Sequence, residues 1–186
     1  MPTKAFSRRL LFAASLCLFA LTLLCTPTGR LSVGARKKTA DGCSLECLKQ
    51  LAAARAATAK YHLESRALAD GYVPVSPCVA VPGLGAMGIH YANFSLMDGR
   101  VDPARPELLL YLPDQNGRRQ LVGVEYFVPA AAVTTAPTLF GKTFDGPMPG
   151  HGPGEPVHYD LHVWLWSHNP AGMFAQFNPK LTCPPA

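Results

Sequence analysis

Residues 157–166 read VHYDLHVWLW, and their strict alternation decides the fold class of the chain. Successive side chains of an extended strand point to opposite faces of a sheet. One face carries only apolar or aromatic side chains: Val157, Tyr159, Leu161, Val163 and Leu165. The other face carries titratable groups followed by two tryptophans: His158, Asp160, His162, Trp164 and Trp166. Because large aromatic side chains are seldom left in solvent, we expect both faces to be covered, as in a ligand cleft or a barrel interior.

Further strands are predicted before this one. Asn116-Gly117 is a strong turn signal, and it lies between the apolar stretches 107–112 and 120–128. This pattern predicts a β-hairpin. Residues 87–93 form another stretch of strand length. Residues 146–156 contain eight glycines or prolines and are predicted to be a loop, and the high proline content of this half of the chain favours short strands joined by long loops.

Residues 44–70 have a different character, because they contain no glycine or proline and are rich in alanine. Apolar residues recur at steps of three and four: Leu45, Leu48, Ala52, Ala56, Ala59 and Leu63. This period predicts an amphipathic helix, with Ser44 as its N-cap and Gly71 just beyond its end. A helix followed by strands indicates an α+β fold, with an N-terminal Ala-rich helix packed on an antiparallel twisted sheet or partial β-barrel.

The net charge of +5 comes from the N-terminal part of the chain. All twelve acidic residues lie from Asp41 onward, where only ten basic residues accompany them. That part therefore carries a charge of −2, and we expect no basic patch of the kind that nucleic-acid-binding proteins use. Residues 36–42 are expected to be a linker and residues 43–186 a single domain.

Residues 1–35 are predicted to be a signal peptide. Residues 1–9 carry three basic side chains, and Leu10 to Cys25 is an uncharged apolar run of sixteen residues. A helix of that length spans about 24 Å, less than the roughly 30 Å of a hydrocarbon core. A basic head with a short apolar run is typical of a secretory signal, and residues 7–11 (SRRLL) resemble a twin-arginine signal. We expect an extracellular or cell-envelope protein, the alternative being an uncleaved leader that anchors the chain to the membrane.

Six cysteines support the same compartment. Cys17 and Cys25 lie in the leader, and four remain in the predicted domain: Cys43, Cys47, Cys78 and Cys183. An even number of cysteines in an exported chain predicts two disulfides, for which three connectivities are open. We favour a Cys78–Cys183 bond, which ties the C-terminus to the start of the proline-rich region, with a local Cys43–Cys47 bond at the start of the helix.

The polar face of the 157–166 strand is the candidate functional site. Alternate side chains lie about 6.6 Å apart, and His158 lies about 13 Å from His162. Two neighbours can share a metal ion, whereas all three converge on one ion only with difficulty, so further ligands must come from elsewhere. The residues expected to bind a ligand are His90, Glu125, His158, Asp160, His162, Trp164 and Trp166. Those expected to hold a divalent metal, zinc or copper, are His90, His158, Asp160 and His162.

An alternative interpretation of the same face is purely structural. In it, Asp160 accepts hydrogen bonds from the neighbouring histidines, and the cluster serves only to specify the fold. The chain contains no Gly-x-Ser-x-Gly, His-Glu-x-x-His, phosphate-loop or dinucleotide motif. We therefore assign no catalytic residue and favour an exported protein that binds a small molecule or a metal in a pocket lined by His, Asp and Trp. The alternatives are a metal-dependent enzyme that uses the His/Asp cluster and a non-catalytic structural or interaction protein of the cell envelope.

Three segments resemble a family of uncharacterised small exported bacterial proteins: residues 85–91 (GAMGIHY), residues 144–151 (FDGPMPGH), and residues 158–166 (HYDLHVWLW) with the NPAGMF that follows at 169–174. The resemblance covers roughly Cys47 to Cys183. It implies export and a common domain, and it transfers no catalytic residue to this chain.

Overall fold

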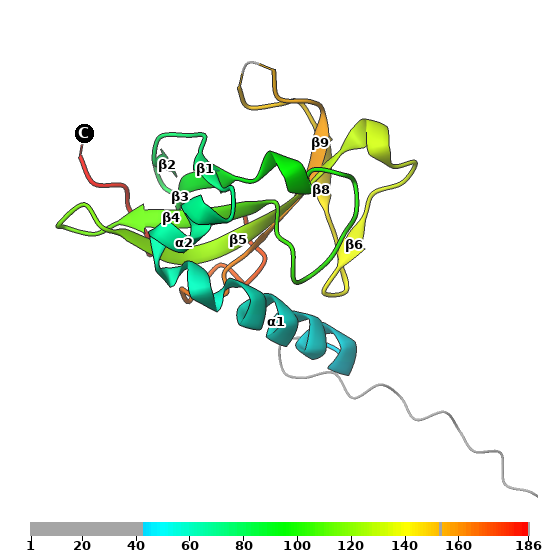
Figure 1. Cartoon of the computed structure of the whole chain (residues 1–186), viewed down its shortest axis with the longest axis horizontal. Helices are drawn as coiled ribbons and strands as arrows, with labels where there is room; N and C mark the ends of the chain where they lie inside the picture. The colour runs from blue at the N-terminus through cyan, green and yellow to red at the C-terminus, as the bar shows by residue number, and fades with distance from the viewer. Residues whose placement is uncertain (1–42, 153, 186) are drawn as a thin grey trace, which may run out of the picture. The chain divides into compact units, whose positions relative to one another are not determined.

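An antiparallel sheet with a helical segment beside it makes up residues 43–152 and 154–185, the part of the chain that the computed structural model describes (Figure 1). The helical segment comprises α1 (Leu45–Thr58), η1 (Ala59–His62) and α2 (Glu64–Ala69). The strands are β1 (Val73–Pro74), β2 (Val79–Val81), β3 (Gly85–Ala92), β4 (Leu108–Pro113), β5 (Arg119–Pro129), β6 (Thr138–Leu139), β7 (Lys142–Thr143), β8 (Asp145–Met148) and β9 (His158–Val163). Two short 3-10 helices are η2 (Phe94–Leu96) and η3 (Ala130–Ala132). The predicted signal peptide, the predicted linker, Cys17 and Cys25 lie outside the described residues.

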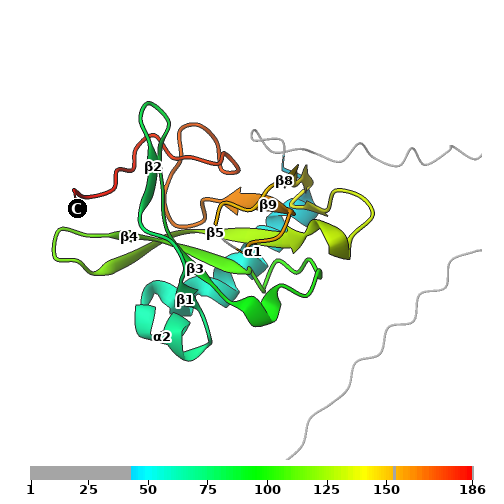
Figure 2. The same cartoon turned by 90° about the horizontal axis from the view of Figure 1, so that it is seen from above.

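The main sheet has seven strands in the order β1-β3-β4-β5-β9-β8, with β2 also paired to β3 (Figure 2). All of its strand pairs are antiparallel. The sheet is open, so the α+β prediction is confirmed, and of its two variants the open sheet is found rather than a barrel. The predicted hairpin is β4–β5, where Asp114 accepts hydrogen bonds from the backbone N–H groups of Asn116 and Arg118. Strand β9 is shorter than predicted, because it ends at Val163.

The loop predicted over residues 146–156 is partly a strand. β8 extends to Met148 and pairs with β9. The glycines and prolines of this segment predicted a loop. An edge strand tolerates proline, however, because no partner strand needs its N–H.

The helical segment is interrupted once, contrary to the prediction of one continuous helix. Leu63 has extended backbone angles (φ −94°, ψ 105°) and separates η1 from α2. Both predicted ends are confirmed. The Ser44 side chain accepts a hydrogen bond from the Cys47 N–H, and Gly71 adopts φ +91°, a conformation that favours glycine.

The predicted apolar stripe of this helix faces outward. Leu45 and Leu63 are 67% and 64% exposed. The buried positions are instead Cys47, Leu51, Ala54, Thr58 and Tyr61, which also follow steps of three and four. Alanine occurs on every side of this helix, so its apolar pattern does not select one face. The larger side chains of Leu51 and Tyr61 fill the core instead.

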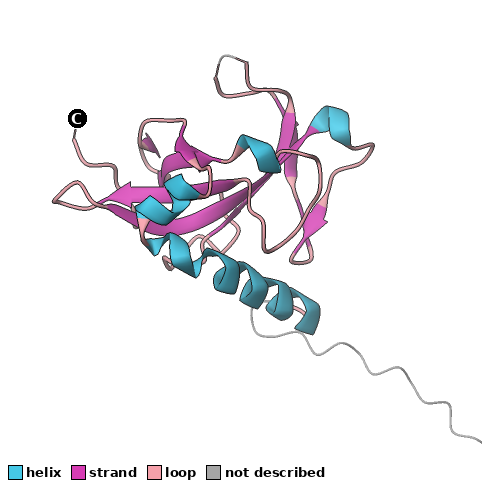
Figure 3. Cartoon of the chain, in the orientation of Figure 1, coloured by secondary structure: helices cyan, strands magenta, loops and turns pink. Residues whose placement is uncertain are grey.

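The two faces of the sheet carry different cores. One face packs against α1 and contains most of the large core cluster, including Tyr111, Tyr126 and Leu161. Figure 3 shows α1 running along this side of the strands. The other face carries two small apolar clusters, Ala92–Leu108–Phe127 and Leu110–Val122–Trp164. The polar side chains of β9 belong to this second face, because they alternate with Leu161 and Val163.

Two disulfides are present, Cys43–Cys47 and Cys78–Cys183, with Cα–Cα distances of 5.5 and 5.8 Å. The favoured connectivity is therefore confirmed. Disulfides are compatible with an oxidising compartment. Within the described residues, no helix combines the length and the apolar character that a membrane crossing requires.

Candidate functional site

Three strands contribute one polar side chain each to a buried group on the second face of the sheet, which we call the buried triad. His90 comes from β3, Glu125 from β5 and His162 from β9. Glu125 and His162 are direct cross-strand neighbours, whereas His90 reaches Glu125 across β4. One potential ligand atom from each of the three residues lies within 4.8 Å of the others. The structure thus brings together two predicted metal ligands and the predicted ligand-binding residue Glu125.

The distances inside the buried triad are too long for good hydrogen bonds. Glu125 Oε2 lies 3.4 Å from His90 Nε2 and 3.6 Å from His162 Nε2, whereas such bonds typically measure about 2.7–3.2 Å. Two ligand atoms of a tetrahedral metal lie about 3.3–3.4 Å apart when each metal–ligand bond is about 2.0–2.1 Å. The 3.4 Å spacing to His90 falls within this range, and the 3.6 Å spacing to His162 lies about 0.2 Å above it.

Burial makes this arrangement costly without a cation. The side chains of His90, Glu125 and His162 are 13%, 6% and 2% exposed. Among the described residues, neither Glu125 Oε2 nor either ring nitrogen of His162 has a hydrogen-bond partner. Burial raises the pKa of the Glu125 carboxyl well above its usual range, and the nearby Asp160 raises it further. A buried polar group without a partner costs free energy, which a bound cation would offset.

The two histidines are electrically neutral at physiological pH. Burial, reinforced by other histidines, lowers the pKa of His90 to about 4 and that of His162 to about 3. A neutral imidazole has one nitrogen with a free lone pair, which is the form that binds metal ions.

The hydrogen bonds of His90 indicate which of its nitrogens is free. Its Nδ1 lies 3.0 Å from the Ser76 hydroxyl oxygen. That hydroxyl donates its only proton to the Pro77 carbonyl, at 2.8 Å, so toward His90 it acts as an acceptor. We therefore assign the ring proton to Nδ1. The lone pair is then on Nε2, the atom that faces Glu125.

A second group lies beside the loop that joins β8 to β9, and we call it the loop triad. It consists of His151, Glu155 and His158. Glu155 Oε1 lies 3.8 Å from His158 Nδ1 and 4.0 Å from His151 Nδ1. The His151 side chain is 63% exposed, whereas that of His158 is 1% exposed. The loop triad is therefore open to solvent on one side.

Hydrogen bonds in the loop triad occupy one ring nitrogen of His158 and one carboxylate oxygen of Glu155. His158 Nδ1 lies 3.0 Å from the Pro156 carbonyl, which can only accept, so Nδ1 carries the proton. The nitrogen nearest Glu155 therefore has no lone pair to offer. Glu155 Oε2 accepts hydrogen bonds from the backbone N–H groups of His151 and Gly152, which anchor this carboxylate to its own loop.

Asp160 belongs to neither triad, although it lies between His158 and His162 on β9. Its side chain is fully buried, and neither carboxylate oxygen has a hydrogen-bond partner among the described residues. Burial, with Asp145 and Glu155 nearby, raises its pKa to about 7. The alternative in which Asp160 accepts hydrogen bonds from the adjacent histidines is therefore not what the described residues form.

The two tryptophans serve different parts of the molecule. Trp164 is buried, packs with Leu110 and Val122, and donates a hydrogen bond to the Ala175 carbonyl. Trp166 contacts the opposite core, where it stacks edge-on against His62. Two surface hollows lie away from the buried triad, one beside Cys183 and one between residues 62–65 and 114–120. Neither tryptophan lines these two hollows, and the two side chains pack with different clusters.

Comparison of the chain with models of protein families, with curated proteins and with solved structures yields no significant match. The resemblance to small exported bacterial proteins stays a prediction. The geometry of the buried triad is therefore the basis on which its function is proposed.

Proposed function

We propose that this chain is a metal-binding protein that holds one divalent transition-metal ion between His90 Nε2, Glu125 Oε2 and His162 Nε2. The observation that carries the proposal is the position of Glu125. Its buried carboxylate oxygen lies 3.4 and 3.6 Å from two imidazole nitrogens, with no hydrogen-bond partner among the described residues.

Zinc suits this set of ligands best. Two imidazoles and one carboxylate form a three-ligand set that zinc accepts, with one further position left for water or another donor. Copper and iron also bind imidazole and carboxylate, and competition among these metals decides between them. Calcium and magnesium prefer sets made of oxygen atoms and are not expected to compete.

Binding is proposed rather than catalysis. A metal-dependent enzyme needs access for its substrate to the open coordination position, and each side chain of the buried triad is 13% exposed or less. We further propose that the protein works outside the cytoplasm, on the basis of its two disulfides and its basic, apolar N-terminal segment.

A zinc titration of the protein without a His-tag tests the proposal, with a chromophoric chelator as competitor. We expect one zinc ion per chain, strong binding lost in His162→Gln, and binding retained in His158→Gln. The two histidines are matched, because both are buried on the same face of β9. Protein that stays free of metal after equilibration with zinc and desalting, with the same melting temperature with and without chelator, would contradict the proposal.

A further inference from the structure

The residue that fixes His90 lies outside the buried triad. Ser76 is in the short connection between β1 and β2, both of which pair with β3. Its hydroxyl oxygen accepts the backbone N–H of His90 at 3.0 Å and lies 3.0 Å from the ring Nδ1 of the same residue. It also donates to the Pro77 carbonyl. A hydroxyl has one proton and two lone pairs, so these three contacts use its full capacity.

The two contacts with His90 restrain it in different ways. The bond to the backbone N–H continues the pairing next to β3, where the Val75 N–H already donates to the His90 carbonyl. The bond to Nδ1 fixes both the orientation of the ring and the position of its proton. Together they direct the free lone pair of Nε2 toward Glu125. A histidine that binds a metal commonly has such a partner on its other nitrogen.

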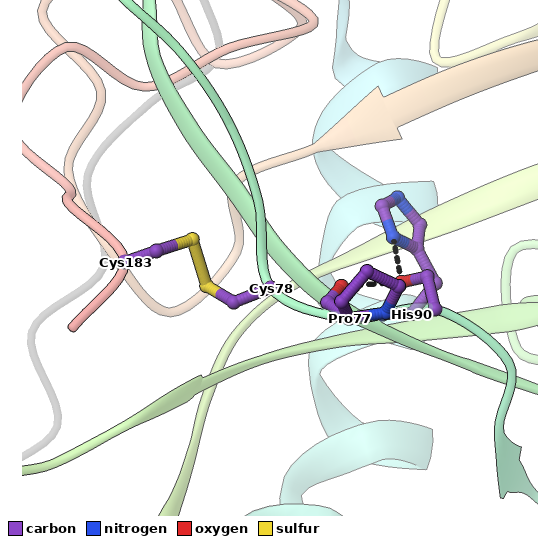
Figure 4. Close-up of a disulfide and its surroundings, with 5 residues drawn as sticks. Pro77, Cys78, His90 and Cys183 are labelled. Atoms are coloured by element: carbon purple, nitrogen blue, oxygen red, sulfur yellow. Dashed lines mark hydrogen bonds between the residues drawn. A yellow bond between two sulfur atoms is a disulfide. The ribbon is translucent and has the colours of Figure 1, made fainter. Parts of the chain in front are cut away.

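A disulfide holds this connection in place. Cys78 follows Ser76 by two residues and is bonded to Cys183 near the end of the chain. Figure 4 shows Cys78, which is bonded to Cys183, and the adjoining Pro77 on one stretch of backbone, with His90 beside it. Pro77 lies between them, and its ring restricts the backbone. The connection from the disulfide to Ser76 is therefore short and stiff.

We propose that Ser76 is the positioning residue of the metal site: it holds His90 with Nε2 free and aimed at Glu125, and the Cys78–Cys183 disulfide keeps Ser76 there. This inference rests on the proposed metal binding at the buried triad. Ser76 itself touches no metal ion in this proposal. The disulfide contributes to metal affinity as well as to stability.

The test compares zinc affinity, measured with a competing chelator, in a set of serine variants of the full chain. Ser76→Ala is expected to bind zinc about 10–100-fold more weakly, the usual cost of losing such a partner. Ser76→Thr keeps the hydroxyl and should restore most of the affinity. Ser95→Ala is the matched control, because among the described residues its hydroxyl bonds to Asn93 alone, and it should leave the affinity unchanged within about twofold.

The disulfide is tested in the same assay with Cys78→Ser/Cys183→Ser. This variant should weaken zinc binding, whereas Cys43→Ser/Cys47→Ser, which removes the bond at the start of α1, should not. If both double variants weaken binding equally, the disulfide has no specific part in the site.

The position of the His90 ring proton can be measured by NMR in the unmodified protein, so this test does not depend on the folding of a variant. The ring-nitrogen NMR signals of His90 should show a proton on Nδ1 in the metal-free protein, and zinc should shift the Nε2 signal. A proton on Nε2, or zinc binding unchanged in folded Ser76→Ala, would overturn the role of Ser76 while leaving the proposed function intact. Wild-type protein that binds no zinc would overturn the proposed function itself.

Discussion

The buried triad and the loop triad have the same composition, two histidines and a glutamate, yet their hydrogen bonds differ. In the buried triad, the Ser76 hydroxyl accepts a hydrogen bond from the Nδ1–H of His90, and the free Nε2 faces the carboxylate. In the loop triad, the Nδ1 of His158 faces both Glu155 and the Pro156 carbonyl, so the nitrogen near the carboxylate carries a proton. The buried triad therefore directs an imidazole lone pair at its carboxylate, whereas the nearest nitrogen of His158 directs a proton at Glu155.

The carboxylates differ in the same sense. Glu125 Oε2, the oxygen that faces both histidines, has no hydrogen-bond partner among the described residues. The Glu155 carboxylate faces its histidines with Oε1, while its Oε2 is bonded to two backbone N–H groups of its own loop. The difference teaches that a metal site is recognised by the unused capacity of its ligand atoms as well as by their spacing. We propose that the first group binds a cation, whereas the carboxylate of the second is bonded to its own loop.

The largest expected effect comes from exchanging the two carboxylates for amides. Glu125→Gln should weaken zinc binding by more than about 100-fold, because it removes a ligand itself, whereas loss of a supporting hydrogen bond costs about 10–100-fold. Glu155→Gln should change the affinity by no more than about twofold. A chelator-competition titration measures both. Equal losses in the two variants would mean that the triads act as one site.

Zinc should stabilise the folded protein through the buried triad alone. At a free zinc concentration about 100 times the dissociation constant, the gain in unfolding free energy is about 2.7 kcal/mol. The rise in melting temperature should persist in His151→Gln and vanish in His162→Gln. If His151→Gln removes the stabilisation as well, the loop triad supplies a ligand and the distinction drawn between the two groups is wrong.

The metal-free protein should become less stable at alkaline pH because of Glu125. The folded-state pKa of this carboxyl is raised, so above its unfolded value of about 4.5 the folded protein binds more protons than the unfolded chain, and stability falls as pH rises. Glu125→Gln removes this titration. In excess chelator, this variant should melt at a higher temperature than the wild type at pH 8, by an amount that shrinks toward pH 5.

The histidines of the buried triad act in the opposite direction. Their folded-state pKa values of about 4 and about 3 lie below 6.5, so stability falls as pH drops from 6.5 through these values. Melting curves of the metal-free wild type should therefore show greatest stability at an intermediate pH. Stability that is independent of pH from 4 to 8 would mean that these groups are not buried as described.

The smallest expected effect lies in the loop triad. Glu155→Gln weakens two hydrogen bonds to the loop backbone, and its side chain is 31% exposed. We expect a loss of no more than about 0.5 kcal/mol in global stability and faster amide hydrogen exchange at His151 and Gly152. Unchanged exchange there would show that Glu155 does not order the loop.

Local patterns predicted the strands better than the helix. Alternation in residues 157–166 correctly placed His158, Asp160 and His162 on one covered face. The helix was predicted over the right residues but with the wrong face inward, since alanines on all sides leave the choice to distant contacts. A bulge interrupts the alternation of β5, because Leu110 of β4 pairs with Gly123 and the next residue, Tyr111, pairs with Leu121. Leu121 consequently joins the core beside α1, whereas Phe127 lies on the other face.

The sequence could name the candidate ligands but could not choose among them. His90 and Glu125 lie far from His162 in the chain, and only the strand order β3-β4-β5-β9 brings them together. His158 and His162 are equivalent in the strand pattern, and the Pro156 carbonyl beside the His158 ring distinguishes them. Ser76 belongs to no motif, and no local signal marks it. The proline that follows it and the nearby Cys78 are the only sequence features that draw attention to this connection.

The most direct test of the difference between the two triads is the position of zinc in a crystal grown with it. An anomalous difference map at the zinc absorption edge locates the ion without reference to the hydrogen-bond assignments. We predict one strong peak at about 2.0–2.2 Å from His90 Nε2, Glu125 Oε2 and His162 Nε2, and none at the loop triad. A peak between His151, Glu155 and His158, or no peak at the buried triad, would contradict the account.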